Sequence, residues 1–185
     1  PKIEEVHRLI EVLRSIGVEV VWEGSTLTLT PPTTLRLENI DSAAAIKTRS
    51  ILMFIGSLIH HFPSFTLPQS GGCTLGLRSI RQHLYALEKF GVSIDVHTDH
   101  YLITHENLKG ATVVLFESSD TATINALLAA ARIRETTVIK YASANYQVQE
   151  VCGFLRTLGV KVDGIGTTTL TIEGVETIDA PVTYT

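Results

Sequence analysis

Several residue types are scarce in this sequence of 185 residues. It contains two cysteines, one methionine and one tryptophan, and aromatic residues make up 6% of the chain. The cysteines, Cys73 and Cys152, are too far apart for the closely paired ligands of a zinc site and too few for a disulfide framework. Apolar runs such as 51–55 are far shorter than a bilayer-spanning segment. We therefore expect a cytoplasmic protein without a membrane segment.

An excess of positive charge is also missing. The 15 Lys and Arg residues are outnumbered by 19 Asp and Glu, which gives a formal net charge of -4. Binding to nucleic acids or to membrane surfaces normally requires a broad basic field, so we expect neither as a partner. The 44% of hydrophobic residues is instead sufficient for one substantial core or two small ones.

What the sequence does contain is an internal repeat aligned on three glycines, Gly17, Gly91 and Gly159. Apolar residues at helical spacing precede each glycine, and residues that alternate in polarity follow it. This pattern predicts three helices that each end at a glycine, followed by a pair of short strands, as at 18–22 and 25–30.

The segments between these copies are also similar to each other. Residues 42–61 and 121–133 are apolar on nearly all sides and predict buried helices, each followed by a short strand at 65–67 or 137–139. Strand-like runs at 34–37 and 112–116 precede them. The predicted fold is α+β, built from βαβαββ units at about 1–31 (incomplete), 32–106 and 107–175 within a single domain, 1–185. The missing half-unit leads us to expect a truncated chain.

The two cysteines occupy different places in this repeat. Cys152 takes the register position of Ile10 in the first copy, so we expect it in the core. Cys73 lies in the glycine-rich stretch 70–78, shortly before a helix predicted to begin near Ser79. Arg78 and the helix N-terminus favour a thiolate or a bound anion there. A reactive and a structural role for Cys73 both remain open at this point.

Several stretches resemble the enolpyruvyl transferases, and among them the UDP-N-acetylglucosamine 1-carboxyvinyltransferases of peptidoglycan synthesis. The similar stretches are Pro1-Lys2, Lys47-Thr48-Arg49-Ser50, Gly71-Gly72-Cys73-Thr74-Leu75-Gly76-Leu77-Arg78 and Thr171-Ile172-Glu173-Gly174-Val175. The resemblance covers essentially all of this chain but less than half of a typical member. It implies an inside-out α/β barrel domain of three repeats, one of two similar domains with the active site between them, so the second domain of the same enzyme is an expected partner.

The resemblance also implies a chemistry without a cofactor. Members transfer the enolpyruvyl group of phosphoenolpyruvate to a hydroxyl of UDP-N-acetylglucosamine and release phosphate, in the first committed step of peptidoglycan synthesis. Cys73 matches the loop cysteine that donates a proton to the methylene carbon and that the epoxide fosfomycin alkylates. Arg49 and Arg78 match arginines that hold the anionic groups, which suits their planar forks. Without the match, Arg49 would be interpreted as a cation on a helix surface.

The acceptor is less clearly indicated. Ser79 and Ile80 stand at positions that contact the nucleotide in the family, and Ser119 matches a phosphate-binding serine. Arg81, however, replaces an aspartate that holds the uridine, and Glu117 replaces a lysine, so that an acid would face a diphosphate. Two alternatives therefore stay open: a divergent transferase with another acceptor, and a noncatalytic binding domain that retains the fold.

The histidines suggest structural roles. His97, His100 and His105 lie along a predicted hairpin, where we favour a polar strand edge over a metal site. His60 and His61 are expected to end the buried helix, where positive charge would offset the helix dipole. We predict no metal site.

Overall fold

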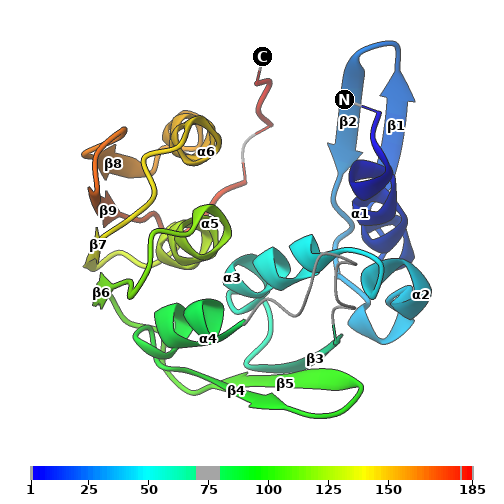
Figure 1. The fold of residues 1–185 in the computed structure, drawn as a ribbon. Coiled ribbons are helices and arrows are strands. Elements are labelled where there is room, and N and C mark those ends of the chain that lie inside the picture. The colour runs from blue at the N-terminus through cyan, green and yellow to red at the C-terminus, as the bar shows by residue number, and fades with distance from the viewer. Residues whose placement is uncertain (1, 70–79, 180, 185) are drawn as a thin grey trace. The chain divides into compact units, whose positions relative to one another are not determined.

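The computed structural model describes residues 2–69, 80–179 and 181–184 (Figure 1). The helices and strands follow the chain in this order: α1 (Glu4–Ser15), β1 (Glu19–Glu23), β2 (Thr26–Thr30), η1 (Leu37–Asn39), α2 (Ser42–Ala45), η2 (Arg49–Met53), α3 (Phe54–Leu58), β3 (Ser64–Pro68), α4 (Arg81–Glu88), β4 (Val92–Val96), β5 (His100–His105), β6 (Thr112–Val114), α5 (Asp120–Ala130), β7 (Thr136–Lys140), α6 (Tyr146–Thr157), β8 (Lys161–Asp163) and β9 (Thr169–Glu173). This is a mixed α+β architecture.

The chain divides into two compact units. The first draws its described residues from 1–52, 65–78 and 95–102, and the second from 53–64, 79–94 and 103–185. The first therefore contains α1, the β1–β2 hairpin and α2, whereas the second contains α3, α4 and everything from β6 onward.

Three sheets are present among the described residues. β1 and β2 form a two-stranded antiparallel sheet, a second sheet has the order β3-β5-β4, and a third has the order β6-β7-β9-β8. In the third sheet β6 pairs parallel with β7, while β9 pairs antiparallel with both β7 and β8. Strand β6, helix α5, strand β7, helix α6 and strands β8 and β9 thus follow one another in the βαβαββ order expected for 107–175.

The three repeat glycines end helices as predicted. Gly17, Gly91 and Gly159 have φ angles of 103°, 91° and 89° and follow α1, α4 and α6. Residues with a Cβ rarely adopt this left-handed conformation, so glycine is favoured at each position. Backbone N–H groups just beyond two of these helices close the last turn, from Val18 to Leu13 O (3.0 Å) and from Val160 to Leu155 O (3.1 Å).

Each unit has its own apolar core. In the first unit, α1 buries Ile10 and Val12 and packs against α2, and Ile16, which follows the helix, is buried as well. In the second unit, α5 is covered on nearly all sides, as its sequence predicts, and packs against α3, α4 and α6. Its Ala122, Ala126, Leu127 and Ala130 are fully buried, and this arrangement fixes the N-terminal end of α5 relative to its neighbours.

Two predicted elements are wrong. Residues 34–37 form no strand, because a backbone donor that a strand ladder would need is used elsewhere. The backbone N–H of Arg36 instead donates to Ile16 O (3.0 Å), and the short helix η1 follows.

The single buried helix predicted at 42–61 is broken into α2, η2 and α3. Thr48 lies at the first break, where its Oγ1 accepts the backbone N–H of Ser50 (3.2 Å). A side chain that takes up a backbone donor in this way competes with the helical hydrogen bond of that residue, which explains the interruption after α2.

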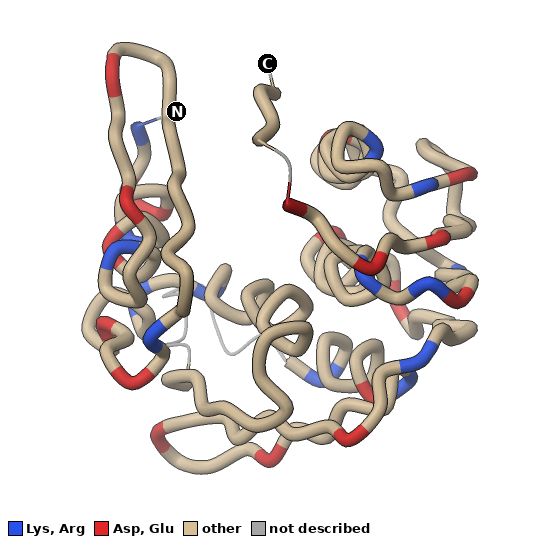
Figure 2. The backbone as a smooth tube through the Cα atoms, turned by 180° about the vertical axis from the view of Figure 1, so that it is seen from behind, with Lys and Arg blue, Asp and Glu red and all other residues tan. Residues whose placement is uncertain are grey.

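Basic and acidic residues are mixed along the described part of the chain. Figure 2 shows Lys and Arg interspersed with Asp and Glu, in agreement with the small net charge of -4. In the part of the chain that is described, no helix has both the length and the apolar character needed to cross a bilayer.

Candidate functional site

The structure describes three of the six candidate site residues. Arg49, Ile80 and Ser119 are described, whereas Cys73, Arg78 and Ser79 lie outside the described residues. Arg49 belongs to the first unit, and Ile80 and Ser119 belong to the second.

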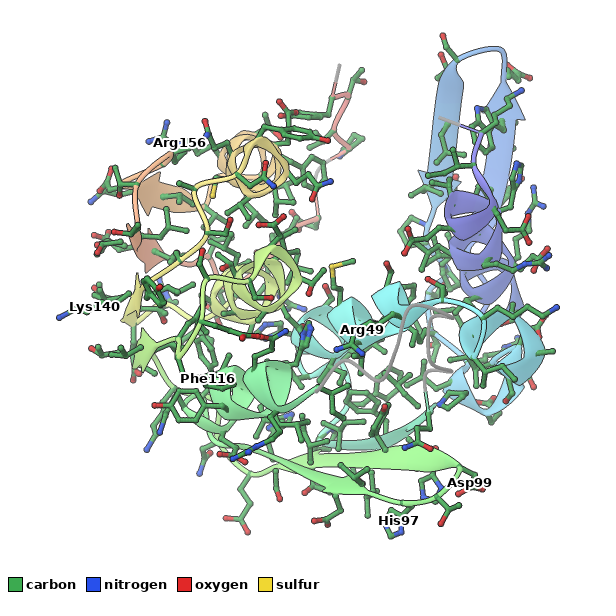
Figure 3. All side chains as sticks on the ribbon, in the orientation of Figure 1. Arg49, His97, Asp99, Phe116, Lys140 and Arg156 are labelled. Carbon is green, nitrogen blue, oxygen red and sulfur yellow. The ribbon has the colours of Figure 1, made fainter. Side chains whose placement is uncertain are left out.

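Arg49 begins the 3-10 helix η2 and is half-buried (Figure 3). The residues on either side of it are attached to the first turn of α1: Thr48 Oγ1 donates to Glu5 Oε1 (3.3 Å), and the Ser50 hydroxyl donates to the same oxygen. One carboxylate therefore fixes the backbone on both sides of Arg49, which limits where the guanidinium can reach.

Ser119 is the N-cap of α5. Its Oγ accepts the backbone N–H of Ala122 (3.4 Å), and its carbonyl oxygen accepts a hydrogen bond from Thr123 Oγ1 (2.7 Å). Because the Ser119 oxygen already accepts, its own hydroxyl hydrogen can be donated to a ligand oxygen. A hydroxyl donor at the positive end of a helix is suited to an anion such as phosphate.

Two acidic residues lie beside this N-cap. Asp120 is turned toward the segment after β7, where its carboxylate accepts hydrogen bonds from the Ser143 hydroxyl and from Asn145 Nδ2 (2.8 Å). Glu117 is exposed. The Asp120 carboxylate therefore has local donors as partners, and Glu117 remains the acid that can oppose a negatively charged ligand.

A buried polar network connects the starts of α4 and α5. Asn125 Oδ1 accepts the backbone N–H of Gly56 (2.8 Å), so its Nδ2 faces His83 Nδ1 and donates to it (3.2 Å). His83 consequently carries its proton on Nε2, which donates to Thr121 Oγ1 (3.2 Å). His83 is 1% exposed and Asn125 is fully buried.

This network connects the candidate residue Ile80 to the first turn of α5, which follows the candidate residue Ser119. The backbone N–H of His83 donates to Ile80 O (2.9 Å), and its ring bonds Thr121, two residues after Ser119. Sequence reasoning missed His83 and Asn125. The available signal was that His83 falls three residues after Ile80, on the apolar face of its helix, where an ionisable residue needs a buried partner.

His97, His100 and His105 make contacts within the fold, as the sequence predicts. The His97 and His100 rings stack with centroids 4.5 Å apart, and His100 Nδ1 bonds Asp99 (2.7 Å), at the turn between β4 and β5 (Figure 3). His105 Nε2 donates to Ile59 O (2.8 Å). Within the described ranges, no group of three or more His, Cys, Asp or Glu residues is arranged to hold a metal ion.

The expectation that His60 carries a positive charge is wrong. Its Nε2 donates to Ala129 O (2.8 Å), and burial, together with a smaller contribution from the nearby Arg132, lowers the pKa of the ring from 6.5 to about 4. A ring with this pKa is neutral near pH 7, so it stabilises the contact between the end of α3 and α5 as a hydrogen-bond donor rather than as a cation.

Cys152 lies in the core as predicted. It is fully buried on α6, and burial raises the pKa of its thiol to about 11. Because the thiolate is the nucleophilic form, Cys152 is unsuited to reaction near neutral pH.

The order of elements from β6 to β9 is that of the repeat unit of the enolpyruvyl transferases, and the N-terminus of α5 is suited to an anion. Together these two features indicate the enolpyruvyl transferase class. The chain belongs to this family, since residues 1–185 match the family model of EPSP synthase (3-phosphoshikimate 1-carboxyvinyltransferase).

Two curated relatives show which members of this family the chain is similar to. The chain is 33% identical over 178 residues to a UDP-N-acetylglucosamine 1-carboxyvinyltransferase of Bradyrhizobium diazoefficiens, a match that covers 96% of this chain and 41% of the relative. It is 33% identical to UDP-N-acetylglucosamine 1-carboxyvinyltransferase 2 of Lactiplantibacillus plantarum, over 100% of this chain and 44% of the relative. The chain thus spans less than half the length of these curated relatives.

Solved structures agree on the fold. The crystal structure of the enolpyruvyl transferase NikO from Streptomyces tendae matches with a TM-score of 0.78 and 21% identity, over 94% of this chain and 41% of that one. An EPSP synthase from Acinetobacter baumannii matches with a TM-score of 0.69 and 15% identity, also over 94% of this chain. At these identities the likeness concerns the fold alone.

Proposed function

We propose that residues 1–185 form the domain of an enolpyruvyl transferase that carries the catalytic loop. The full enzyme would transfer the enolpyruvyl group of phosphoenolpyruvate to UDP-N-acetylglucosamine in the cytoplasm and release phosphate. The observation that carries this proposal is the 33% identity to a UDP-N-acetylglucosamine 1-carboxyvinyltransferase across 96% of the chain. The proposal includes the inside-out barrel arrangement of the repeats and a second domain of the same enzyme.

The proposed roles divide between acid and anion contacts. Cys73 donates the proton to the methylene carbon of phosphoenolpyruvate, and Arg78 and Arg49 hold its phosphate and carboxylate. Ser79, Ile80 and Ser119 contact the acceptor. Support for Ser119 comes from its position at the α5 N-cap, with a hydroxyl hydrogen that can be donated to phosphate.

A second candidate function rests on Glu117, an acidic residue close to the proposed acceptor-binding residue Ser119. Glu117 is exposed two residues before Ser119, and an exposed carboxylate repels a nucleotide diphosphate. This observation favours a transferase that uses another, less negatively charged acceptor. A noncatalytic domain that retains the fold is the remaining alternative.

Alkylation by fosfomycin tests the proposed role of Cys73. The full-length protein is incubated with fosfomycin and UDP-N-acetylglucosamine, and its intact mass is measured. We expect one adduct, which is lost in Cys73→Ala and kept in Cys152→Ala. An absence of adducts, or an adduct that depends on Cys152, would contradict the proposal.

Phosphate release with a panel of acceptors then separates the candidate functions. Turnover with UDP-N-acetylglucosamine supports the first proposal, and turnover only with another hydroxyl acceptor supports the second. An adduct at Cys73 without turnover on any acceptor would favour the noncatalytic alternative.

A further inference from the structure

The interrupted helix at 42–61 sets the middle repeat apart from the last one. The buried helix of the last repeat, α5, is continuous over 11 residues, whereas the corresponding stretch of the middle repeat is divided into α2, η2 and α3. η2 is a 3-10 helix of 5 residues, and Arg49 is the first of them. A stretch of 3-10 helix between α-helical segments often marks a functional position.

The threonine at the break explains the interruption only together with its partner. Thr123 lies in the first turn of α5, and its Oγ1 donates to Ser119 O (2.7 Å), so its hydroxyl bonds within its own helix, which continues. Thr48 is 3% exposed, but its Oγ1 donates away from its own helix to Glu5 Oε1 (3.3 Å). The difference between the two repeats is therefore the acceptor that α1 supplies, Glu5.

Glu5 holds the chain on both sides of Arg49. Besides Thr48, the Ser50 hydroxyl donates to the same oxygen, Glu5 Oε1. Glu5 is in the first turn of α1, where the positive end of the helix favours a charged carboxylate. Hydrogen bonds to a charged acceptor are stronger than those to a neutral one. All of these residues belong to the first unit.

The Glu5 contacts are not needed to join α1 to α2. Ile10 and Val12 of α1 are 5% and 0% exposed, Ala44 and Ala45 of α2 are 2% and 0% exposed, and the two helices pack together. Burial of apolar side chains is the main stabilising contribution in such a contact, whereas hydrogen bonds to an exposed carboxylate compete with water. The more specific consequence of the Glu5 contacts is the placement of the arginine between the two hydroxyls.

We propose that Glu5 is a positioning residue for Arg49 in the transferase reaction. This inference rests on the proposed function, in which Arg49 holds the anionic groups of phosphoenolpyruvate. Because Glu5 fixes the backbone before and after the arginine, it limits the positions that the long side chain can reach. The guanidinium then loses less freedom when the donor binds, which favours binding.

The KM values of the full-length enzyme for donor and acceptor test this role. We expect Glu5→Ala to raise the KM for phosphoenolpyruvate about tenfold and to change the KM for the acceptor less than about twofold, since only the donor contact is misplaced. Glu5→Gln should stay within about threefold of the wild type, because its amide oxygen can still accept both hydroxyl hydrogens. A lower melting temperature without a selective effect on the donor would indicate a merely structural role and would overturn the proposal.

Glu4→Ala is the matched control. Glu4 is in the same turn of α1, and its carboxylate pairs with Arg8. The variant removes the same charge from the same end of the helix, and we expect both KM values to stay unchanged. An equal rise in the donor KM for Glu4→Ala and Glu5→Ala would assign the effect to the charge alone and would overturn the proposal.

A combination with Arg49→Ala separates this inference from the proposed function. Phosphoenolpyruvate binding to the full-length protein is measured by titration calorimetry, which requires no turnover. If Glu5 acts through Arg49, Glu5→Ala should have almost no further effect on binding in the Arg49→Ala background, whereas a full second loss would overturn the inference.

The single variants show which proposal fails. Weaker donor binding in Arg49→Ala, with normal binding in Glu5→Ala, would overturn the positioning role and leave the proposed function intact. Normal donor binding in Arg49→Ala would contradict the proposed role of Arg49 itself, and the positioning role of Glu5 would be overturned with it.

Discussion

At the scale of single residues, the neutral ring of His60 couples folding to pH. Its pKa is about 4 in the folded chain and 6.5 ordinarily, so the unfolded state binds more protons between these values. The free energy of unfolding therefore falls as the pH drops from 6.5 to 4, and this residue causes no further loss below pH 4. We expect a loss of about 2 kcal/mol, allowing for the partial exposure of the ring.

Urea unfolding at several pH values measures this effect. His60→Gln can still donate a hydrogen bond to Ala129 O but does not titrate, so its stability should fall less steeply over the same range. Some slope should remain, because burial also lowers the pKa of the neighbouring His61. Identical pH profiles for the wild type and His60→Gln would contradict the assignment.

Glu117 offers a residue-scale test of acceptor choice. If its exposed carboxylate opposes a diphosphate, Glu117→Lys in the full-length enzyme should lower the KM for UDP-N-acetylglucosamine by roughly fivefold, since a charge reversal at partly screened distances is worth about 1 kcal/mol. Glu88→Lys makes the same charge change at an exposed position at the end of α4 and serves as the control. An equal KM for both variants would remove Glu117 from the acceptor site.

At the scale of elements, the contact between α3 and α5 depends on a glycine. A Cβ added at Gly56 would lie 2.4 Å from Asn125 O and 2.6 Å from Asn125 Oδ1, far inside normal contact. Gly56→Ala must therefore separate the two helices or break the hydrogen bond to Asn125, and we expect a loss of about 3 kcal/mol in the free energy of unfolding.

Gly24→Ala provides the comparison for this measurement. Gly24 has a φ of 60° and nothing within 4 Å of an added Cβ, so only its backbone conformation resists the change. Denaturant unfolding should give a loss of about 1 kcal/mol for this variant. A Gly56→Ala variant no less stable than Gly24→Ala would show that the two helices can move apart freely.

The elements also show how far the sequence could predict the structure. Helices α1, α4 and α6 were predictable because a glycine with positive φ ends each of them, and α5 because it is apolar on nearly all sides. The break at Thr48 was not, since it depends on a side chain that bonds Glu5 forty-three residues earlier as well as its own backbone. The candidate site was likewise predictable only in part. Ser119 could be proposed from the resemblance, but the hydrogen bond between His83 and Asn125 could not, because only the packing of α4 against α5 brings these two residues together.

At the scale of the whole molecule, we predict that residues 1–185 alone catalyse nothing measurable. The curated relatives that the chain matches are more than twice its length, with coverage of 41% and 44%. In the proposed mechanism the acid at Cys73 and a base from the second domain act on opposite sides of one substrate. Holding both groups in place is worth many orders of magnitude in effective concentration, on the order of 10⁵ M or more.

A phosphate-release assay with phosphoenolpyruvate and UDP-N-acetylglucosamine checks this prediction. The chain alone should stay at background, while the full-length enzyme at equal concentration should turn over and lose that activity in Cys73→Ala. Turnover by residues 1–185 that Cys73→Ala abolishes would contradict the prediction, because one domain would then supply both the acid and the base. Weak phosphate binding without turnover agrees with it, since anion contacts at Arg49 and Ser119 require only this chain's own residues.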